Sequence, residues 1–502
     1  MLLTDRYQDR VRGVLGCYDR VIITGTLPDF GHAQAATRYL NMQKIRIFNF
    51  AAFAKPLRDA IRTNAERLAR EAGIEIEYLR KAKAVRKEAR IQEILAKRGH
   101  APGLVHIFSV LENCTTYEPW HDKRTHRTFL RPDSGKCVHY YFYFIDDEFG
   151  LCYLRVPTWA PYRLQFYFNG HNWLAGELRK RNIAFRLIDN VFVDIEDFTR
   201  AQKIADRFSV KALHRFLNQL AATCCPALEP FPAGYHWSTM QCEYATDIVF
   251  RSRAGLADLY DTLVRTAIHA VKAEDVATFL GRKLDPRTTA EVGTDFHTRI
   301  QGTRIKHHMG PTAVKMYDKF GSVLRMETVT NDVSFFKHRR EVVHHDGSTE
   351  WKLAPVRKSI YSLPALAELL AASNRRYLEF LSSLDDVSTG ARRVDRISRT
   401  AQHGTRRYRG FNVLDPQDRK LFEILERGEF NIRGFQNRDL RRHLPERTAP
   451  ATCRLLKRLR THGLVKRIGN TYKYYLTKLG RRVIAAALAI REFLVIPVLA
   501  RA

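Results

Sequence analysis

The last ninety residues carry the sequence signals that most restrict how this chain can fold. Asp415-Pro416 predicts a helix start, because proline suits the first helical turn, where its missing N–H is not needed. Thr448-Ala449-Pro450 predicts a second such start, and Gly463 predicts the end of that helix, because glycine suits a left-handed C-cap. Two short apolar runs around Gly469-Asn470 predict a hairpin. Helix, helix, helix, hairpin and helix are therefore expected at 415–428, 434–440, 448–463, 464–476 and from 479 onward.

On the third of these helices, Ala451, Leu455 and Leu459 recur every four residues and should face a core. The order of elements resembles the winged helix-turn-helix of MarR-type regulators and of many mobile-element DNA-binding proteins, over about the last ninety residues. The resemblance implies that the third helix enters the major groove of duplex DNA and that the hairpin meets phosphates. The basic residues expected at DNA on this basis are Arg438, Arg441, Arg454, Lys457, Arg458, Arg460, Lys466, Arg467 and Lys473.

The charge of the chain points to the same kind of partner. The 502 residues include 84 Lys or Arg and 53 Asp or Glu, a net charge of +31. From 401 to 502 there are 23 basic and 8 acidic residues, so a fifth of the length carries about half of the excess. Clustered cations favour polyanions, because each phosphate contact releases counterions. Nucleic acid, above all duplex DNA, is the expected partner, and a homodimer is left open.

A second pattern lies between Gly302 and Glu327, where three short antiparallel strands are expected. Alternation places Ile305, Val314, Met316, Leu324 and Met326 in the core. The opposite face should then carry a tyrosine, a histidine, a glutamate and five cations. These residues are Arg304, Lys306, His308, Lys315, Tyr317, Lys319, Arg325 and Glu327.

Tyr317-Asp318-Lys319 followed by Leu324-Arg325-Met326-Glu327 resembles a stretch of rolling-circle replication initiators. The resemblance implies that Tyr317 attacks a DNA phosphodiester while His308 and Glu327 hold Mg²⁺ or Mn²⁺. The lysines Lys306, Lys315 and Lys319 would bind the DNA, and nearby cations would favour the phenolate of Tyr317. The chain departs from that family because His307 and His308 are adjacent and so point to opposite faces. A basic, non-catalytic sheet is the alternative.

Three other groups of residues could carry chemistry. Glu243 and Asp247 share a face if Met240 to Phe250 is a strand, and with Asp19 or Glu327 they could hold two metal ions; ion-paired acids are the alternative. Zinc could bind Cys114, His121, Cys137 and His139, although no C-x-x-C motif is present. The aromatic runs 140–144 and 159–168 could stack on unpaired bases or fill a core.

The chain is predicted to be an α+β body with antiparallel sheets followed by a C-terminal winged helix-turn-helix. The expected divisions are 1–200 (α+β), 201–385 (helices and a basic sheet), 386–410 (exposed basic linker) and 411–502 (winged helix). The eight cysteines lie in mostly apolar surroundings and predict reduced thiols. With no secretory signal at the N-terminus and no stretch apolar enough to span a bilayer, a cytoplasmic protein without membrane contact is expected.

Three functions fit this sequence. The favoured one is a DNA-binding protein of a plasmid- or transposon-like element, acting in replication initiation or strand transfer. The second is a non-enzymatic, MarR-like transcription regulator. The third is a protein that binds structured RNA. Whether the chain is an enzyme is left open by the sequence.

Overall fold

The computed structural model describes residues 2–80, 87–284, 291–299, 302–344, 346–384, 396–412, 414–427, 429–430, 434–469 and 471–490. The chain forms two compact units. We call Tyr7–Ala257 with Val276–Tyr377 the body, and Met1–Arg6, Asp258–Asp275 and Leu378–Ala502 the C-terminal unit. Among the described helices, none is long and apolar enough to cross a membrane.

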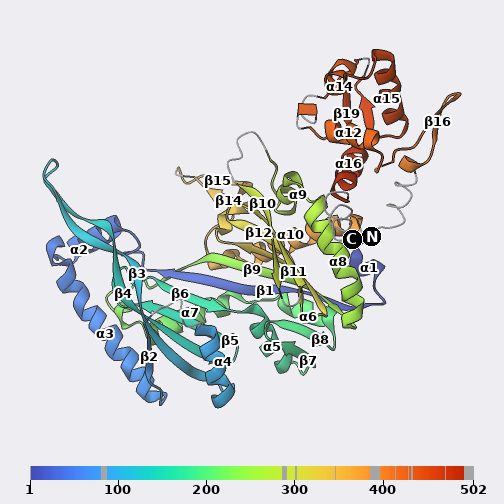
Figure 1. The fold of residues 1–502 in the computed structure, drawn as a ribbon. Helices are drawn as coiled ribbons and strands as arrows, with labels where there is room; N and C mark the ends of the chain where they lie inside the picture. Colours follow the sequence, from blue (N-terminus) through green and yellow to red (C-terminus); the bar gives the residue numbers. More distant parts are fainter. Residues whose placement is uncertain are drawn as a thin grey trace. The chain divides into compact units, whose positions relative to one another are not determined.

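The body is built on one eleven-stranded sheet of order β10-β11-β12-β13-β9-β1-β6-β5-β4-β3-β2. The sheet is mixed, because β2 pairs in parallel with β3 while the other pairs are antiparallel. The long strands β1 and β9 lie side by side at its centre (Figure 1). Its strands are β1 Val11–Thr26, β2 Ile76–Leu79, β3 Gly103–Asp122, β4 Arg127–Asp146, β5 Gly150–Pro157, β6 Leu164–Phe168, β9 His236–Phe250, β10 Val292–Arg299, β11 Gly302–Met309, β12 Thr312–Lys319 and β13 Val323–Thr330.

One face of this sheet carries the main hydrophobic core. Tyr18, Val21, Phe142, Leu154 and Phe166 from the strands pack in it against helices. The helices with residues in this core are α2 Ala33–Met42, α3 Phe50–Glu71, α5 Gly170–Lys180, α6 Phe198–Ala205, α7 Val210–Cys224 and α10 Leu363–Leu384. A smaller core lies under α4 Lys87–Arg98, where Ile91 and Leu95 meet Tyr141 and Tyr143. The body therefore has an apolar face and a second face that α4 covers only in part.

Shorter elements complete the body and lead into the C-terminal unit. Two two-stranded sheets pair β7 with β8 and β14 with β15. The elements are β7 Phe185–Ile188, β8 Val191–Ile195, β14 Lys337–Val343, β15 Thr349–Pro355, α8 Arg253–Ala270, α9 Ala273–Phe279 and the four short 3₁₀ turns η1 Ile47–Asn49, η2 Pro226–Leu228, η3 Val333–Phe335 and η4 Ile360–Ser362. The chain starts with α1 Leu3–Arg6.

The C-terminal unit contains the expected helices and hairpin. They are α12 Pro416–Leu425, α14 Asn437–His443, α15 Ala449–Thr461, β18 Val465–Arg467, β19 Tyr474–Leu476 and α16 Lys478–Ile490. Asp415 caps α12 and Thr448 caps α15 through their side chains, and Gly463 has the left-handed φ of +73° expected after α15. Leu421, Leu440, Leu455, Leu459 and Ile484 belong to one core.

The structure describes only part of the expected linker. Of 386–410, residues 386–395 lie outside the described residues. The remainder forms a hairpin of β16 Ala401–His403 and β17 Arg406–Tyr408, and Ile397 is buried in the core of the C-terminal unit. Most residues of 396–410 are exposed, and the buried apolar side chains Ile397 and Phe411 anchor this segment to the core of the C-terminal unit.

The prediction for 302–327 is confirmed as local structure. β11, β12 and β13 are antiparallel neighbours, and all five side chains expected in the core are buried. His307 and His308 point to opposite faces as predicted: His307 is fully buried and hydrogen-bonds Tyr377 and Thr294. Seven of the eight cysteines are at least partly buried and unpaired, and Cys453 is the exposed exception.

Candidate metal-binding and phosphate-handling site

Three carboxylates from three neighbouring strands meet on the open face of the sheet. Asp19 comes from β1, Glu243 from β9 and Glu327 from β13, and one oxygen of each lies within 4.8 Å of the others. Within the described residues, no other His, Cys, Asp or Glu side chains form such a group. Carboxylate oxygens are the ligands that Mg²⁺ and Mn²⁺ prefer, so this set fits a divalent cation of that kind.

A β-bulge brings Asp19 into this group. Tyr18 pairs with Tyr244 and Arg20 pairs with Glu243, so Asp19 is an extra residue between two consecutive pairs. In such a bulge two residues of one strand oppose one residue of the other, which redirects a side chain. Asp19 and Arg20 therefore both lie on the face of Glu243, while Tyr18 and Val21 stay in the core.

The charges of the three carboxylates oppose one another. Burial raises the pKa of Glu243, and the neighbouring Glu327 raises it further. Burial alone would also raise the pKa of Asp19, but Arg325 and His171 hold it well below its usual range. Lys315 Nζ binds Glu327 Oε2 at 2.7 Å and compensates part of the charge. A divalent cation would relieve the remaining repulsion between Glu243 and its neighbours.

The phenol of Tyr317 belongs to the same site. Its hydroxyl donates a hydrogen bond to Glu327 Oε1 at 3.1 Å, and the side chain is 7% exposed. Burial, and then the charge of Glu327, raise the pKa of Tyr317 well above its usual value. The expectation that nearby lysines favour the phenolate is thus wrong for this environment: Lys315 binds Glu327, and Lys319 binds Asp189 and Asn190.

Arg325 and Asp247 form the buried support of the site instead of facing solvent. Arg325 is fully buried and donates to both oxygens of Asp247, at 2.6 and 2.7 Å. Its third nitrogen lies 3.3 Å from Asp19 Oδ2, and His171 Nδ1 lies 3.2 Å from Asp19 Oδ1. Asp247 is therefore the ion-pair partner of Arg325 and does not join the group of three carboxylates. This agrees with the alternative given for Asp247 in the sequence analysis, an ion-paired acid that binds no metal.

The start of α5 fixes Asp19 from the other side. Asn169 caps the helix by accepting from the backbone of His171 and Asn172, and its amide donates to Asp19 Oδ1 at 3.1 Å. Gly170 is required here, because a Cβ would lie 2.2 Å from the carbonyl oxygen of Tyr18. Sequence reasoning missed Asn169 and His171; the short polar run Asn169-Gly170-His171 after a buried strand was the available signal.

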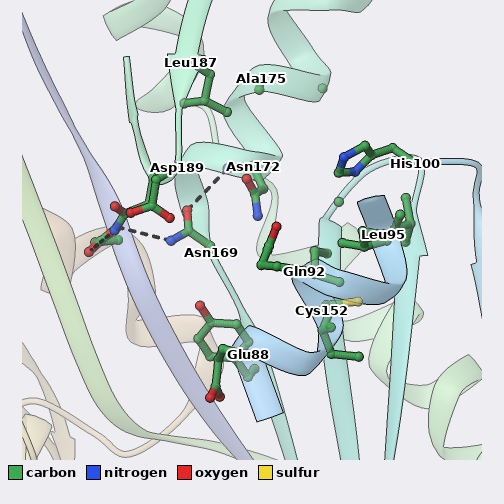
Figure 2. A pocket seen from close by; sticks show the side chains of 18 of the residues that line it. Glu88, Gln92, Leu95, His100, Cys152, Asn169, Asn172, Ala175, Leu187 and Asp189 are labelled. Atoms are coloured by element: carbon green, nitrogen blue, oxygen red, sulfur yellow. Dashed lines mark hydrogen bonds between the residues drawn. The ribbon is translucent and has the colours of Figure 1, made fainter. Parts of the chain in front are cut away.

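The site opens into a large cleft on the same face of the body, with a volume of about 1660 Å³. Asp19, Glu243, Lys315, Tyr317 and Glu327 line one part of it. The other part lies between α4, which contributes Glu88, Gln92 and Leu95, and α5, which contributes Asn172 and Ala175 (Figure 2). A chain-like ligand could therefore contact both the carboxylates and the space between the two helices.

His308 and the zinc candidates are not brought to this site. His308 lies on β11, two strands from Glu327, with Nε2 3.7 Å from Asp295. Two strand spacings are about 10 Å, too far for His308 and Glu327 to share an ion. The four expected zinc ligands do not come together either. Cys137 and His139 are neighbours, but His121 lies seven residues along β3 from Cys114 and pairs with Thr128 of β4. Neither ligand set forms.

In the C-terminal unit, arginines surround a pocket of about 520 Å³. It lies between the β16–β17 hairpin, α12 and α15, and its basic residues are Arg406, Arg407, Arg409, Arg447, Arg454 and Arg458. Of the residues expected at DNA, Arg454, Lys457 and Arg460 on α15 are exposed, as are Arg438, Arg441, Lys466, Arg467 and Lys473. A phosphate at this unit would therefore meet exposed cations on α15 and on the β18–β19 hairpin.

Arg458 departs from the expectation. It is buried, binds both oxygens of Asp418 at 2.7 and 2.8 Å, and donates to the backbone carbonyls of Arg409 and Gly410. Its guanidinium also lies 3.8 Å from the centre of the Phe411 ring. With its donors engaged inside the unit, Arg458 supports the fold and is not retained as a DNA contact.

Comparison with known proteins adds little to this geometry. No protein-family model and no curated protein matches the chain. Among solved structures, the chain is similar to the rolling circle replication initiator protein from Geobacillus stearothermophilus, at 9% identity and a TM-score of 0.20, over 72% of this chain and 97% of that one. At this TM-score the similarity supports no conclusion about fold or site.

Proposed function

We propose that the body cleaves a DNA strand with Tyr317 as nucleophile at a divalent-metal site made by Asp19, Glu243 and Glu327. The observation that carries the proposal is the hydrogen bond from the Tyr317 hydroxyl to Glu327 Oε1, within the only group of three close carboxylates among the described residues. A nucleophile, a base that touches it and a cation site are the components that phosphoryl transfer needs.

In the proposed step one bond to phosphorus forms as another breaks, and Glu327 carries the proton that is moved. The Tyr317 oxygen attacks phosphorus, its proton passes to Glu327 Oε1, and the bond from phosphorus to one bridging oxygen of the DNA breaks. That oxygen takes the proton back from Glu327 and leaves as a hydroxyl, and the phosphate stays joined to Tyr317. Because the pKa of Tyr317 is raised, the phenol needs a base such as Glu327. A bound Mg²⁺ or Mn²⁺ would supply charge stabilisation for the phosphate.

The test uses the full-length chain with supercoiled and single-stranded DNA, in Mn²⁺, Mg²⁺ or EDTA. The wild type should nick DNA and form a covalent adduct only with metal. Tyr317→Phe should abolish the adduct, and Glu243→Gln should slow nicking at least about 100-fold, in the range of lost metal and acid–base contributions. Glu350→Gln, at an exposed carboxylate of β15, is the matched control and should nick normally.

Two results would overturn the catalytic proposal. One is a wild type that forms no adduct with either DNA under any divalent metal. The other is a Tyr317→Phe variant that still becomes linked to DNA. A chain that binds duplex DNA without cutting it would instead act as the non-enzymatic regulator, and a chain that prefers folded RNA in competition would be the RNA-binding protein.

For the C-terminal unit, we propose a winged helix-turn-helix that binds duplex DNA through α15 and the β18–β19 hairpin. Two features support this. Phe435 and Tyr474 exchange backbone hydrogen bonds of 2.9 and 2.8 Å, an antiparallel bridge that joins the segment before α14 to the β18–β19 hairpin. Gly434 permits that approach, because a Cβ there would lie 2.8 Å from the Tyr474 carbonyl oxygen. Arg454 and Lys457 on α15 are exposed, which supports their proposed contact with DNA.

The DNA-binding proposal is tested by Arg454→Ala with Lys457→Ala in the full chain. The pair should weaken duplex binding about 10-fold or more at moderate salt and lower the salt slope by about two units, because each lost phosphate contact removes about one. Arg481→Ala with Arg482→Ala on α16 removes the same charge from exposed positions of another helix. If both pairs lose the same affinity, α15 does not read the DNA.

A further inference from the structure

A basic hairpin projects from the C-terminal unit beside α15. It consists of β16 Ala401–His403 and β17 Arg406–Tyr408 and extends outward from the helices of that unit (Figure 1). No residue of 401–409 is buried, so the hairpin itself contributes no side chain to a core. A two-stranded hairpin of this length is not stable by itself in water, so its position depends on the chain at its base.

The base of this hairpin is fixed to the folded unit. Ile397 and Phe411 are buried in the core, and the Phe411 amide donates to the Ile397 carbonyl at 2.8 Å. Arg458 on α15 donates to the carbonyls of Arg409 and Gly410. The hairpin is therefore an arm held at a defined place against α15.

The arginine-lined pocket of about 520 Å³ lies between this arm and α15. Its arginines come from the arm, from the loop before α15 and from α15 itself, and no described acidic residue lines it. They are Arg406, Arg407, Arg409, Arg447, Arg454 and Arg458. The lining thus carries charge of one sign, unlike the cleft of the body, where carboxylates and cations alternate.

Only two of these arginines form an ion pair with a described acidic residue. Arg458 binds Asp418, and Arg409 lies 3.5 Å from Asp415 and 3.7 Å from Asp418. The other four have no carboxylate within ion-pair distance in the described part of the chain. Cations gathered around one space repel one another, and an anion between them removes that repulsion.

The arginine side chains indicate which anion fits. A guanidinium donates two parallel hydrogen bonds to one phosphate, which makes phosphate groups well matched to such a pocket. The pocket has more room than one phosphate group needs, so it admits a stretch of sugar–phosphate backbone. Arg454 lines the pocket and also belongs to the helix proposed to bind duplex DNA, so a backbone held here is that of the same duplex.

We propose that the β16–β17 hairpin is a second DNA-binding element, which holds the sugar–phosphate backbone of duplex DNA in the arginine pocket beside the groove that α15 enters. The inference rests on the proposed function of the C-terminal unit and adds a contact that α15 and the β18–β19 hairpin do not make. Contacts to phosphates position a protein on DNA without reading its sequence, so this contact should be the same on any duplex.

The experiment measures duplex binding by the full-length chain in EDTA, so it does not depend on metal or cleavage. Arg406→Ala with Arg407→Ala should weaken binding about 10-fold at moderate salt and lower the salt slope by about two units, because two phosphate contacts are lost. The loss should be equal on duplexes of unrelated sequence. Arg481→Ala with Arg482→Ala, the exposed pair on α16, removes the same charge and should change the affinity by less than about 2-fold.

Duplexes with a single methylphosphonate locate the contact, because this group replaces one charged phosphate by a neutral one. The wild type should bind more weakly when particular phosphates are neutral, and the Arg406→Ala with Arg407→Ala variant should no longer respond to one or two of these positions. A β18–β19 variant, Lys466→Ala with Lys473→Ala, should still respond to them. Arg406→Lys with Arg407→Lys keeps the charge and should bind more tightly than the alanine pair, with the salt slope of the wild type.

The outcomes separate this inference from the DNA binding it builds on. An alanine pair with unchanged affinity and salt slope overturns the hairpin contact, even if Arg454→Ala with Lys457→Ala shows that α15 binds DNA. A loss in the hairpin pair beside unchanged binding in the α15 pair supports the hairpin contact and contradicts the role of α15. A wild type that binds no duplex overturns both.

Three other results would also overturn the backbone contact. A lysine pair that binds as weakly as the alanine pair would show that charge is not what the arm supplies. Binding that requires a 5′-phosphate at the duplex end would make the pocket a site for strand ends. A hairpin pair that loses folded RNA but keeps duplex DNA would make the arm an RNA contact.

Discussion

The body and the C-terminal unit each bury one arginine against one aspartate, and the two pairs differ in what surrounds them. Arg325 and Asp247 lie beneath the carboxylates of the cleft, and Arg325 also approaches Asp19. Arg458 and Asp418 are enclosed by backbone carbonyls and by the Phe411 ring. The same pair thus positions a site in one unit and only holds a fold in the other. Burial of a charge does not by itself mark function.

The largest effect should come from removing the shared arginine of the body. Arg325→Met leaves Asp247 and Asp19 buried with His171 as their remaining partner and should destabilise the body by about 3–5 kcal/mol. Hydrogen exchange of β9 and β13 peptides, measured in the full chain, reports this locally. Arg339→Met at an exposed position of β14 is the control. Unchanged protection in Arg325→Met would mean that the network contributes little to the fold.

Arg458→Met should destabilise the C-terminal unit by roughly 2–4 kcal/mol. The effect should be smaller than that of Arg325→Met, because Arg458 leaves one acid, Asp418, and two backbone carbonyls unpaired, whereas Arg325 contacts two acids. Hydrogen exchange of α12 and α15 should rise while β9 and β13 are unaffected. At a temperature where the unit stays folded, duplex binding should fall by less than about 2-fold, in contrast to Arg454→Ala. A salt slope reduced by one unit would instead make Arg458 a phosphate contact.

The smallest effect is a dependence on pH that belongs to the body. Burial alone would lower the pKa of His171, but Cys17, Asp19 and Asp247 raise it well above its usual value. Because the pKa of His171 is higher in the folded than in the unfolded state, its charged form stabilises the fold. This contribution is complete below the unfolded-state pKa, about 6.5, and is lost as the pH rises from there through the folded-state pKa. The body should therefore lose at most about 1.4 kcal/mol per pH unit above pH 6.5. Thermal unfolding between pH 6 and 9 measures the slope.

His171→Gln should flatten that slope, because the variant has no imidazole to titrate. His236→Gln, at an exposed position of β9, is the matched control and should keep the slope of the wild type. A slope that survives in His171→Gln would assign the titration to another group.

Local patterns predicted local structure well and long-range assembly poorly. Alternation placed Tyr317 and Glu327 on one face, and the structure joins their side chains. It could not show that β9 lies between β1 and β13, which brings Asp19 and Glu243 to Glu327. It also suggested His308 as a ligand, because residue type alone does not reveal a separation of two strands. For Arg458, helical spacing did not reveal that the 401–411 segment covers that side of α15.

The bulge at Asp19 has a consequence for how the sheet tolerates change. Tyr18 and Arg20 pair with the consecutive residues Tyr244 and Glu243, so the ladder from Val11 to Thr26 does not need position 19. A chain with that one residue deleted could pair without interruption there and keep every later side chain on its present face. Deletion of Tyr18 or Val21, which lie on the core face on either side of the bulge, would instead shift the side chains beyond it to the wrong face. The pairing of β1 with β9 therefore does not require Asp19, and what this residue adds to the strand is a carboxylate beside Glu243 and Glu327.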